Sequence, residues 1–373
     1  MSGVTTMQRT PFYDFHVSHG GKMVDYAGWE MPLHYGSIMD EHRQVRRGGG
    51  LFDVSHMGRL RFKGRDAVRF LDRVCTRQIA GMQDGQVRYG LICNDQGGCM
   101  DDVLVYRVSE TEYLVVCNAA NRATLLGHFE NVRGELVFKL KDQTQSTAMI
   151  AVQGPAVMDI IANFSSEIPS LKRYRFTTKN LFIASFMVSR TGYTGEDGVE
   201  IILPASFASR AIDMLLKRVD QDDAAVQPVG LGARDSLRLE AGMPLYGHEI
   251  TADIDPLSAG LAFAVKLDKG EGECEVERFI GQDALRAIAE PGPRQRLVGL
   301  LLDGRRSPRQ DMSVLVNNEV IGRVTSGCLS PTLDQPIAMA YVPAEFDGDG
   351  VQVDLGRTIA ASTIVPLPFY KRS

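Results

Sequence analysis

Two neighbouring carboxylates, Asp101 and Asp102, open a segment that is otherwise typical of an apolar strand. Successive residues of a strand point to opposite faces of the sheet, so at least one carboxylate should face a mostly apolar layer. A buried charge is costly unless a partner or a function holds it there. One interpretation is therefore a functional carboxylate. The other is that both residues only end the preceding turn and that burial begins later in the strand.

A third carboxylate, Glu200, lies inside a short apolar segment, Val199 to Leu203, which follows a turn-rich stretch ending in Asp197-Gly198. The segment predicts a strand. Glu200 is then either an exposed residue of an edge strand or a carboxylate that binds the polar edge of a ligand.

Two arginines, Arg234 and Arg238, are four residues apart in a predicted helix with glycines at both ends. Residues at this spacing share one helix face. They form either a solvated basic stripe that pairs with Glu240 or Asp235, or a fork for a carboxylate or a fused heterocycle. Two acidic sites and one arginine, with no metal or phosphate motif, outline a site for a neutral-to-anionic heterocycle.

Several common chemistries lack their motifs. The sequence has no GxxxxGK[ST] phosphate loop, no GxGxxG after a strand, no HExxH and no GxSxG. None of the six cysteines forms a CxxC pair, which argues against zinc and favours reduced thiols in a cytoplasm. His16 and His19 are three residues apart without a partner cluster, so we interpret them as surface histidines. We expect no metal.

Length and composition set further limits. A chain of 373 residues predicts two or three domains. Its net charge of −5 lacks the basic excess that is typical of nucleic-acid binders. No apolar run approaches the ~20 residues that span a bilayer, and the N-terminus lacks a signal-peptide core. We therefore expect neither nucleic acid nor membrane as a partner.

The elements that must position these side chains fall into two patterns. In the first, strands are followed by helices twice, which predicts two α+β units. The turn at 94–98 predicts a hairpin there, and the stretch 191–198 a second one. The predicted strands are Arg59–Lys63, Tyr89–Cys93, Asp102–Val108, Tyr113–Cys117, Ala148–Gln153, Leu181–Val188 and Val199–Leu203, and the helices are Asp66–Val74, Asn121–Phe129, a segment ending at Ile161, Phe207–Val219 and Gly230–Ala241.

The second pattern follows the turn-rich stretch Glu290 to Pro293. Here short strands recur at regular spacing, which predicts a small all-β barrel or sandwich. They are Leu297–Leu302, Ser313–Val316, Glu319–Thr325, Ile337–Val342 and Val351–Val353. By contrast, the first 50 residues read as irregular, with turns at 19–21 and at the flexible-looking glycines 48–50.

At these residues the chain resembles the aminomethyltransferases, the T-proteins of the glycine cleavage system. The resemblance runs nearly end to end. It is carried by Lys22–Leu33 (KMVDYAGWEMPL), Leu51–Gly58 (LFDVSHMG), Asp101-Asp102, Gly192–Glu196 (GYTGE), Gly232–Asp235 (GARD) and Val324–Leu333 (VTSGCLSPTL). So many ordered motifs are far more specific than one short pattern.

The resemblance implies an α+β fold, with two interleaved α+β folate-binding subdomains in residues 1–285 and a small C-terminal β-barrel in residues 286–373, around a central channel. It also implies a reaction. The lipoylated H-protein of the system would be the partner and tetrahydrofolate the co-substrate. An aminomethyl group on the dihydrolipoyl arm would yield ammonia, 5,10-methylenetetrahydrofolate and the reduced arm.

The resemblance also assigns residues. Asp102 matches the family's catalytic aspartate, and Glu200 matches the acid that pairs with the 2-amino and ring N–H groups of the pterin. Arg234 matches the arginine at the folate site. The tyrosines Tyr89, Tyr193 and Tyr370 match positions that line the folate pocket, although the C-terminus aligns loosely. A fixed carboxylate would stabilise an iminium-like cation in a water-poor cleft and help to move protons to ammonia.

Two alternatives share this family pattern. One is a folate-dependent demethylase that acts on a small methylated sulfur or nitrogen compound. The other is a non-catalytic folate-binding accessory protein, against which the Asp101-Asp102 pair and the Tyr-Thr-Gly-Glu segment argue.

Overall fold

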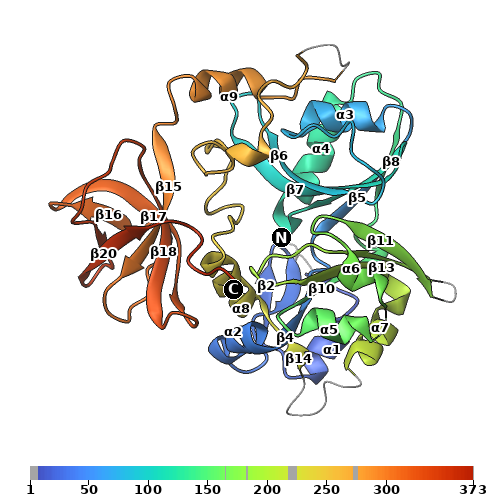
Figure 1. The fold of residues 1–373 in the computed structure, drawn as a ribbon, viewed down its shortest axis with the longest axis horizontal. Coiled ribbons are helices and arrows are strands. Elements are labelled where there is room, and N and C mark those ends of the chain that lie inside the picture. The colour runs from blue at the N-terminus through green and yellow to red at the C-terminus, as the bar shows by residue number, and fades with distance from the viewer. Residues whose placement is uncertain (1–6, 164, 182–183, 217–224, 272–275, 373) are drawn as a thin grey trace, which may run out of the picture.

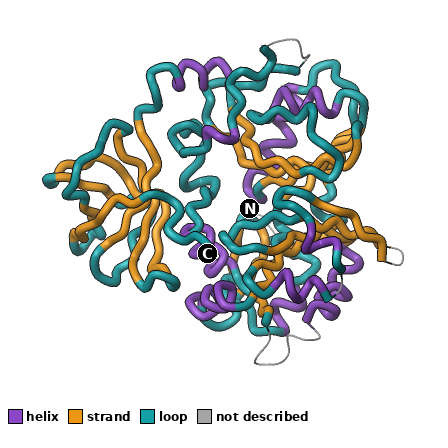
Figure 2. Tube along the Cα trace, viewed as in Figure 1, coloured by secondary structure: helices purple, strands orange, loops and turns teal. Residues whose placement is uncertain are grey.

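The structure is a computed structural model that describes residues 7–163, 165–181, 184–216, 225–271 and 276–372. Its main parts are two β-sheets with helices packed on them, which lie one above the other, and a β-barrel to their side (Figure 1). The barrel side is built of strands and loops, whereas helices gather around the two sheets (Figure 2). This arrangement confirms the predicted α+β class with a C-terminal barrel.

The first sheet has six strands in the order β11-β12-β13-β10-β4-β14. Its outer face is covered by apolar residues from α5 and α7. The strands and helices are β4 (Gly49–Asp53), β10 (Thr147–Gln153), α5 (Val157–Ala162), α6 (Glu167–Ser170), β11 (Phe176–Leu181), β12 (Ala184–Ser189), β13 (Gly198–Pro204), η2 (Ala205–Phe207), α7 (Ala208–Leu216) and β14 (Val226–Pro228).

The second sheet has five strands in the order β6-β7-β8-β5-β9, and α3 and α4 pack on one face of it. Because β5 to β9 lie between β4 and β10 in the chain, the two sheets are interleaved, as expected. The elements are β5 (Gly58–Lys63), α3 (Ala67–Val74), β6 (Val87–Cys93), β7 (Cys99–Ser109), β8 (Glu112–Cys117), η1 (Ala119–Asn121), α4 (Arg122–Val132) and β9 (Lys139–Asp142).

A shared core joins the two sheets. It combines Phe52 and Met149 of the first sheet with Tyr106 and Val116 of the second, and Leu237 of α8 (Leu231–Glu240). Burial of this apolar surface is the main force that holds the sheets face to face. The residues at the rim of this core are therefore well placed to line a site between the sheets.

The C-terminal region is a closed six-stranded barrel, in the order β15-β18-β17-β16-β19-β20. Its strands are β15 (Gln295–Leu302), β16 (Ser313–Val316), β17 (Glu319–Ser330), β18 (Gln335–Pro343), β19 (Gln352–Asp354) and β20 (Ile359–Val365). β20, which closes the barrel on β15, was not predicted, because Ile359–Val365 alternates only weakly between apolar and polar residues. The proposed division of the chain at 285/286 falls inside α9 (Gln282–Ala289).

Residues 7–50 contain helices and strands, so the prediction of an irregular segment is wrong for this part of the chain. They form β1 (Gln8–Arg9), α1 (Tyr13–Ser18), β2 (Met23–Tyr26), β3 (Trp29–Pro32), α2 (Ile38–Arg47) and the start of β4. The expected flexibility of the glycines 48–50 is also wrong. A Cβ added to Gly50 would lie 2.6 Å from Val45 Cγ2 and 2.7 Å from Val229 Cγ2, so the position requires the smallest residue for packing.

Two other predictions are corrected. The segment Leu181–Val188 is not one strand, because β11 ends at Leu181 and the antiparallel β12 begins at Ala184; no glycine or proline between 176 and 189 signals this break. His16 is not a surface residue. It is 1% exposed, and its Nε2 lies 2.9 Å from Asp53 Oδ2 and its Nδ1 2.7 Å from the Tyr35 hydroxyl.

Two predicted features extend beyond the described residues. The expected end of the helix at Val219 and the cysteine at 274 both lie outside them. The other five cysteines are free, in agreement with the expectation of reduced thiols.

Candidate active site

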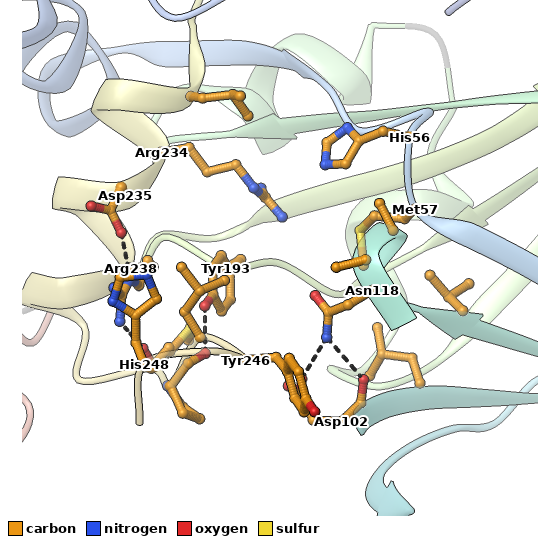
Figure 3. A pocket seen from close by; sticks show the side chains of 18 of the residues that line it. His56, Met57, Asp102, Asn118, Tyr193, Arg234, Asp235, Arg238, Tyr246 and His248 are labelled. Carbon is orange, nitrogen blue, oxygen red and sulfur yellow. Dashed lines mark hydrogen bonds and ion pairs between the residues drawn. The ribbon is translucent and has the colours of Figure 1, made fainter. Parts of the chain in front are cut away.

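A cavity of about 780 Å³ lies between the two sheets, and residues of the segment 242–263 line part of it. This volume is in the range of small-molecule sites. Five of the six residues expected at the site line it, namely Asp102, Glu200, Arg234, Tyr89 and Tyr193. The cavity therefore brings together residues from β6, β7, β13, α8 and the stretch after β12 (Figure 3).

Asp101 and Asp102 point to opposite faces of β7, as the strand geometry predicted. Asp101 is fully buried, and its carboxylate accepts hydrogen bonds from the Asn118 backbone N–H (3.0 Å), Asn118 Nδ2 (2.7 Å) and Asn121 Nδ2 (2.8 Å). Asp102 lines the cavity and accepts from Asn118 Nδ2 at 2.7 Å and from the Tyr89 hydroxyl at 3.2 Å. The interpretation that both residues merely end a turn does not hold.

The two carboxyls share Asn118, so they titrate as a pair. Burial raises the pKa of both groups, and the charge of Asp102 raises that of Asp101 further. The donors around them oppose this effect, Asn118 on both groups and Tyr89 on Asp102. A carboxylate that is desolvated, oriented and open to the cavity is suited to stabilise a developing positive charge or to move a proton.

Glu200 is buried rather than exposed at an edge, because β13 pairs with β10 on one side and β12 on the other. Its carboxylate accepts a hydrogen bond from the Thr191 hydroxyl. Burial raises the pKa of Glu200, although Thr191 and the charge of Arg234 oppose the shift. A buried carboxylate with one donor still has acceptor capacity for the N–H groups of a ligand.

Arg234 projects from α8 into the cavity without an anionic partner in the described chain. Its guanidinium carbon lies 4.9 Å from the centre of the Tyr193 ring and 5.9 Å from that of Phe52. Its Nη1 is buried and has no hydrogen-bond partner among the described residues. A buried donor without a partner is costly. The guanidinium has further N–H donors, and since Arg234 lines the cavity it can donate to an acceptor of a ligand there.

Arg238 does not join Arg234 in a fork, and it is not solvated either. It is fully buried, and it donates to Glu249 Oε2 (2.8 Å), Asp235 Oδ1 (2.8 Å) and the Ser326 hydroxyl of the barrel (2.8 Å). Glu249 in turn accepts from the Thr325 hydroxyl at 2.6 Å. Arg238 thus ties the cavity wall to the barrel.

The three tyrosines have different roles. Tyr89 donates to Asp102, and its ring stacks on Phe263 at 6.1 Å. The Tyr193 hydroxyl donates to the Pro244 carbonyl, which fixes its ring beside Arg234. Tyr370 does not line the cavity. Its ring lies under the Arg46 guanidinium at 3.9 Å, and its backbone N–H donates to the Glu240 carbonyl at 2.8 Å.

Among the polar lining residues that the sequence prediction did not select are Asn118 and His56. Asn118 follows β8 and orients both aspartates. His56 is 5% exposed, and its Nδ1 has no partner in the described part of the chain. Asn118 lies far from the aspartates in sequence, so no local pattern could have found it. His56 lies inside the LFDVSHMG motif, which was a signal that could have found it.

Two searches of the described residues were negative. They contain no helix long and apolar enough to cross a membrane. In the same ranges, no group of three or more His, Cys, Asp or Glu side chains is placed to hold a metal ion.

The geometry defines a class: a small-molecule site in which buried carboxylates and an unpaired arginine line a cavity of heterocycle size. Comparisons with known proteins give the family. Residues 12–269 match the GCVT N-terminal domain, and residues 295–371 match the glycine cleavage T-protein C-terminal barrel domain. The chain therefore belongs to the glycine cleavage T-protein family of aminomethyltransferases, which are tetrahydrofolate-dependent transferases.

Individual relatives agree over the full length. The chain is 45% identical to an aminomethyltransferase of Rubrobacter xylanophilus, with 98% of this chain and 95% of the relative covered. It is 42% identical to that of Exiguobacterium sibiricum, with 99% of each covered. It also matches the crystal structure of the glycine cleavage system aminomethyltransferase T from Bartonella henselae, with a TM-score of 0.89, 33% identity and 98% of each chain covered.

Proposed function

We propose that this chain transfers the one-carbon unit of an aminomethyl group, held as a thioaminal on the dihydrolipoyl arm of a carrier H-protein, to tetrahydrofolate. The bonds that join the transferred carbon to the sulfur and to the amino nitrogen break, and this carbon forms two new bonds, to N5 and N10 of the folate. Ammonia, 5,10-methylenetetrahydrofolate and the reduced arm leave. The carbon keeps its oxidation level, so the reaction requires no oxidant.

One observation carries the proposal: a single cavity receives the desolvated carboxylate of Asp102 at one place and Glu200 with the unpaired Arg234 at another. Glu200 would accept the 2-amino and ring N–H groups of the pterin, since a carboxylate can take two such bonds. Tyr89 and Tyr193 offer aromatic faces beside this position. Asp102 would then face the atoms that react.

Asp102 would act in two ways. Its charge would stabilise the positive charge that develops on the transferred carbon, because the surrounding cavity screens charges poorly. Its oxygens would also pass a proton to the departing ammonia. Asn118 and Tyr89 would hold the carboxylate in place during both steps.

The lipoylated H-protein is proposed as the partner because relatives that cover nearly the whole chain are named aminomethyltransferases and the solved relative is a component of the glycine cleavage system. A cytoplasmic location is proposed as well, since buried free thiols favour a reducing compartment.

The test is an ammonia-release assay with purified chain, tetrahydrofolate and H-protein whose lipoyl arm carries the aminomethyl group. We expect ammonia and 5,10-methylenetetrahydrofolate in equal amounts, and no 5,10-methylenetetrahydrofolate when the H-protein is not loaded. If the protein binds tetrahydrofolate but releases no ammonia, the aminomethyl substrate is wrong, and methylated small molecules become the substrates to examine.

A further inference from the structure

The C-terminal segment, residues 366–372, runs from the barrel to the end of α8. Phe369 packs on β15, since a Cβ added to Gly299 would lie 2.9 Å from its ring. The backbone N–H of Tyr370 donates to the Glu240 carbonyl at the end of α8 (2.8 Å). Figure 1 accordingly places the C-terminal end beside α8, between the barrel and the sheets. The segment therefore ties the barrel to α8.

The loop that joins β12 to β13, residues 190–197, forms part of the cavity wall. Thr191 and Tyr193 of this loop line the cavity. The Thr191 hydroxyl donates to the Glu200 carboxylate, and the Tyr193 hydroxyl donates to the Pro244 carbonyl. The position of the loop therefore sets where the Tyr193 ring and the donor to Glu200 lie.

The C-terminal segment contacts the same loop outside the cavity. A Cβ added to Gly195 of the loop would lie 3.7 Å from Tyr370 Cδ1. Arg372 Nη1 lies 3.7 Å from Asp197 Oδ2. Neither Tyr370 nor Arg372 lines the cavity, so their effect on a ligand there is indirect.

Arg46 of α2 joins the loop to the C-terminal segment. Its side chain is 8% exposed, and its Nη1 donates to two acceptors of the loop, the Thr194 carbonyl (2.7 Å) and Glu196 Oε1 (2.8 Å). Its Nη2 donates to Glu240 Oε2 at 2.9 Å. The Tyr370 ring covers the guanidinium at 3.9 Å. The ring attracts the charge and restricts the orientation of the planar group, whose donors therefore stay directed at the loop.

The proposed catalytic carboxylate is held differently. Asp102 lies on β7 of the second sheet, and Asn118 and Tyr89 orient it. None of these three residues belongs to the 190–197 loop or to the C-terminal segment. A displaced loop should therefore weaken ligand binding and leave the transfer step largely intact.

We propose that Tyr370 is a positioning residue, which together with Arg46 holds the 190–197 loop in the geometry that binds tetrahydrofolate. The inference rests on the proposed function. It gives the C-terminal segment a role in folate affinity although the segment lies outside the cavity. Without the ring, the guanidinium can take other orientations, and the ligand must then order the loop at a cost in affinity.

The experiment measures ammonia release at varied tetrahydrofolate and saturating loaded H-protein, and tetrahydrofolate affinity by titration calorimetry. Tyr370→Ala should raise KM and Kd for tetrahydrofolate about tenfold, the value of one cation–aromatic contact, with kcat close to that of the wild type. Tyr370→Phe keeps the ring over Arg46 and should restore most of the affinity. A variant that is merely less stable contains less active enzyme, which lowers the apparent kcat and leaves KM unchanged.

Two further variants complete the test. Tyr13→Ala removes a ring that lies 4.0 Å from the Arg9 guanidinium, a contact of the same kind away from the cavity, and should change neither constant. Arg46→Lys keeps a positive charge beside Glu240 but loses the planar fork that reaches the loop as well, so KM should rise here too. It provides the reading if thermal melting shows that Tyr370→Ala does not fold.

A folded Tyr370→Ala with the KM and Kd of the wild type, or with a lower kcat at unchanged KM, would overturn the role of Tyr370 while the proposed function stands. An equal rise in KM in Tyr13→Ala would overturn it as well. If the wild type binds tetrahydrofolate but releases no ammonia, the proposed function fails, and the ratio of the two Kd values still decides the role of Tyr370. A wild type that does not bind tetrahydrofolate would overturn both.

Discussion

Asp101 and Asp102 occupy different environments although they are adjacent in the sequence. Asp101 is surrounded by three amide donors and does not reach the cavity, whereas Asp102 meets the cavity with fewer donors. Their division of roles follows from strand geometry: Asp102 is proposed to act at the cavity, whereas Asp101 holds Asn118 and, with a pKa raised to about 8, stays neutral while Asp102 is charged.

Asp101→Asn should therefore leave the acid limb of the pH profile of transfer in place. The proposed role needs Asp102 ionised, so kcat/KM falls as pH drops through its raised pKa. Burial and the charge of Asp102 raise the pKa of Asp101 to about 8, so Asp101 is neutral where Asp102 ionises, and asparagine removes no charge there. The measurement is kcat/KM against pH. Asp95→Asn, in the exposed turn of the same hairpin, is the control for a surface change; a limb that moves to lower pH in Asp101→Asn alone would contradict this division of charge.

At the scale of elements, β4 shows why a glycine run was misread. Three successive glycines suggest a flexible turn, but Gly49 and Gly50 are buried in a strand between β10 and β14. A Cβ added to Gly49 would lie against Val157 and Val226, and a Cβ added to Gly50 would lie against Val45 and Val229. These contacts come from segments far apart in the chain, and local sequence patterns do not contain them.

Gly50→Ala should destabilise the fold by about 1–3 kcal/mol, because a methyl group overpacks the junction of β4, α2 and the stretch before α8. Gly127→Ala is the matched control: Gly127 lies in α4, and an added Cβ would meet nothing within 4 Å, so alanine should stabilise by about 0.5–1 kcal/mol. Urea denaturation measures both. Equal stability of Gly50→Ala and wild type would contradict the packing argument.

Features that depend on local sequence patterns could be predicted, whereas features that depend on contacts between distant segments could not. Hairpins and the strands near Asp102 and Glu200 were predicted because turn residues and apolar alternation are local signals. The burial of His16, the separation of Arg234 from Arg238 and the role of Asn118 were not, because each depends on a partner from another element. The family motifs supplied the site residues, and the structure adds how they are held.

At the scale of the whole molecule, a buried polar cluster joins the two sheets to the barrel. Glu240 at the end of α8 is fully buried, and it accepts from His42 (3.0 Å), Arg46 (2.9 Å), the Ser330 hydroxyl (2.5 Å) and the Thr332 hydroxyl (2.7 Å). Burial alone would raise its pKa, but His42, Ser330 and Arg46 outweigh this and lower it to about 2. Glu240 thus links α2 and α8 to the loop after β17.

Glu240→Gln should cost about 3–5 kcal/mol, because it removes the charge that the buried Arg46 and its neighbours require. Since the folded-state pKa is depressed, the stabilisation by Glu240 is present above the ordinary carboxyl pKa near 4.5 and is lost as pH falls towards 2. Urea unfolding at pH 7 and pH 3 should show a smaller difference between variant and wild type at pH 3. Glu319→Gln, at an exposed barrel position, is the control; a difference independent of pH would contradict the assignment.

The most direct test of the account is Asp102→Asn in the ammonia-release assay with loaded H-protein and tetrahydrofolate. The carboxylate is proposed to stabilise charge and to move a proton, so its loss should slow release by at least about 100- to 1,000-fold. The affinity for tetrahydrofolate and the melting temperature should stay close to those of the wild type, because Glu200 and Arg234 are proposed to hold the pterin and a buried carboxylate of raised pKa is not needed for folding. Near-normal release by the folded variant would contradict the central claim.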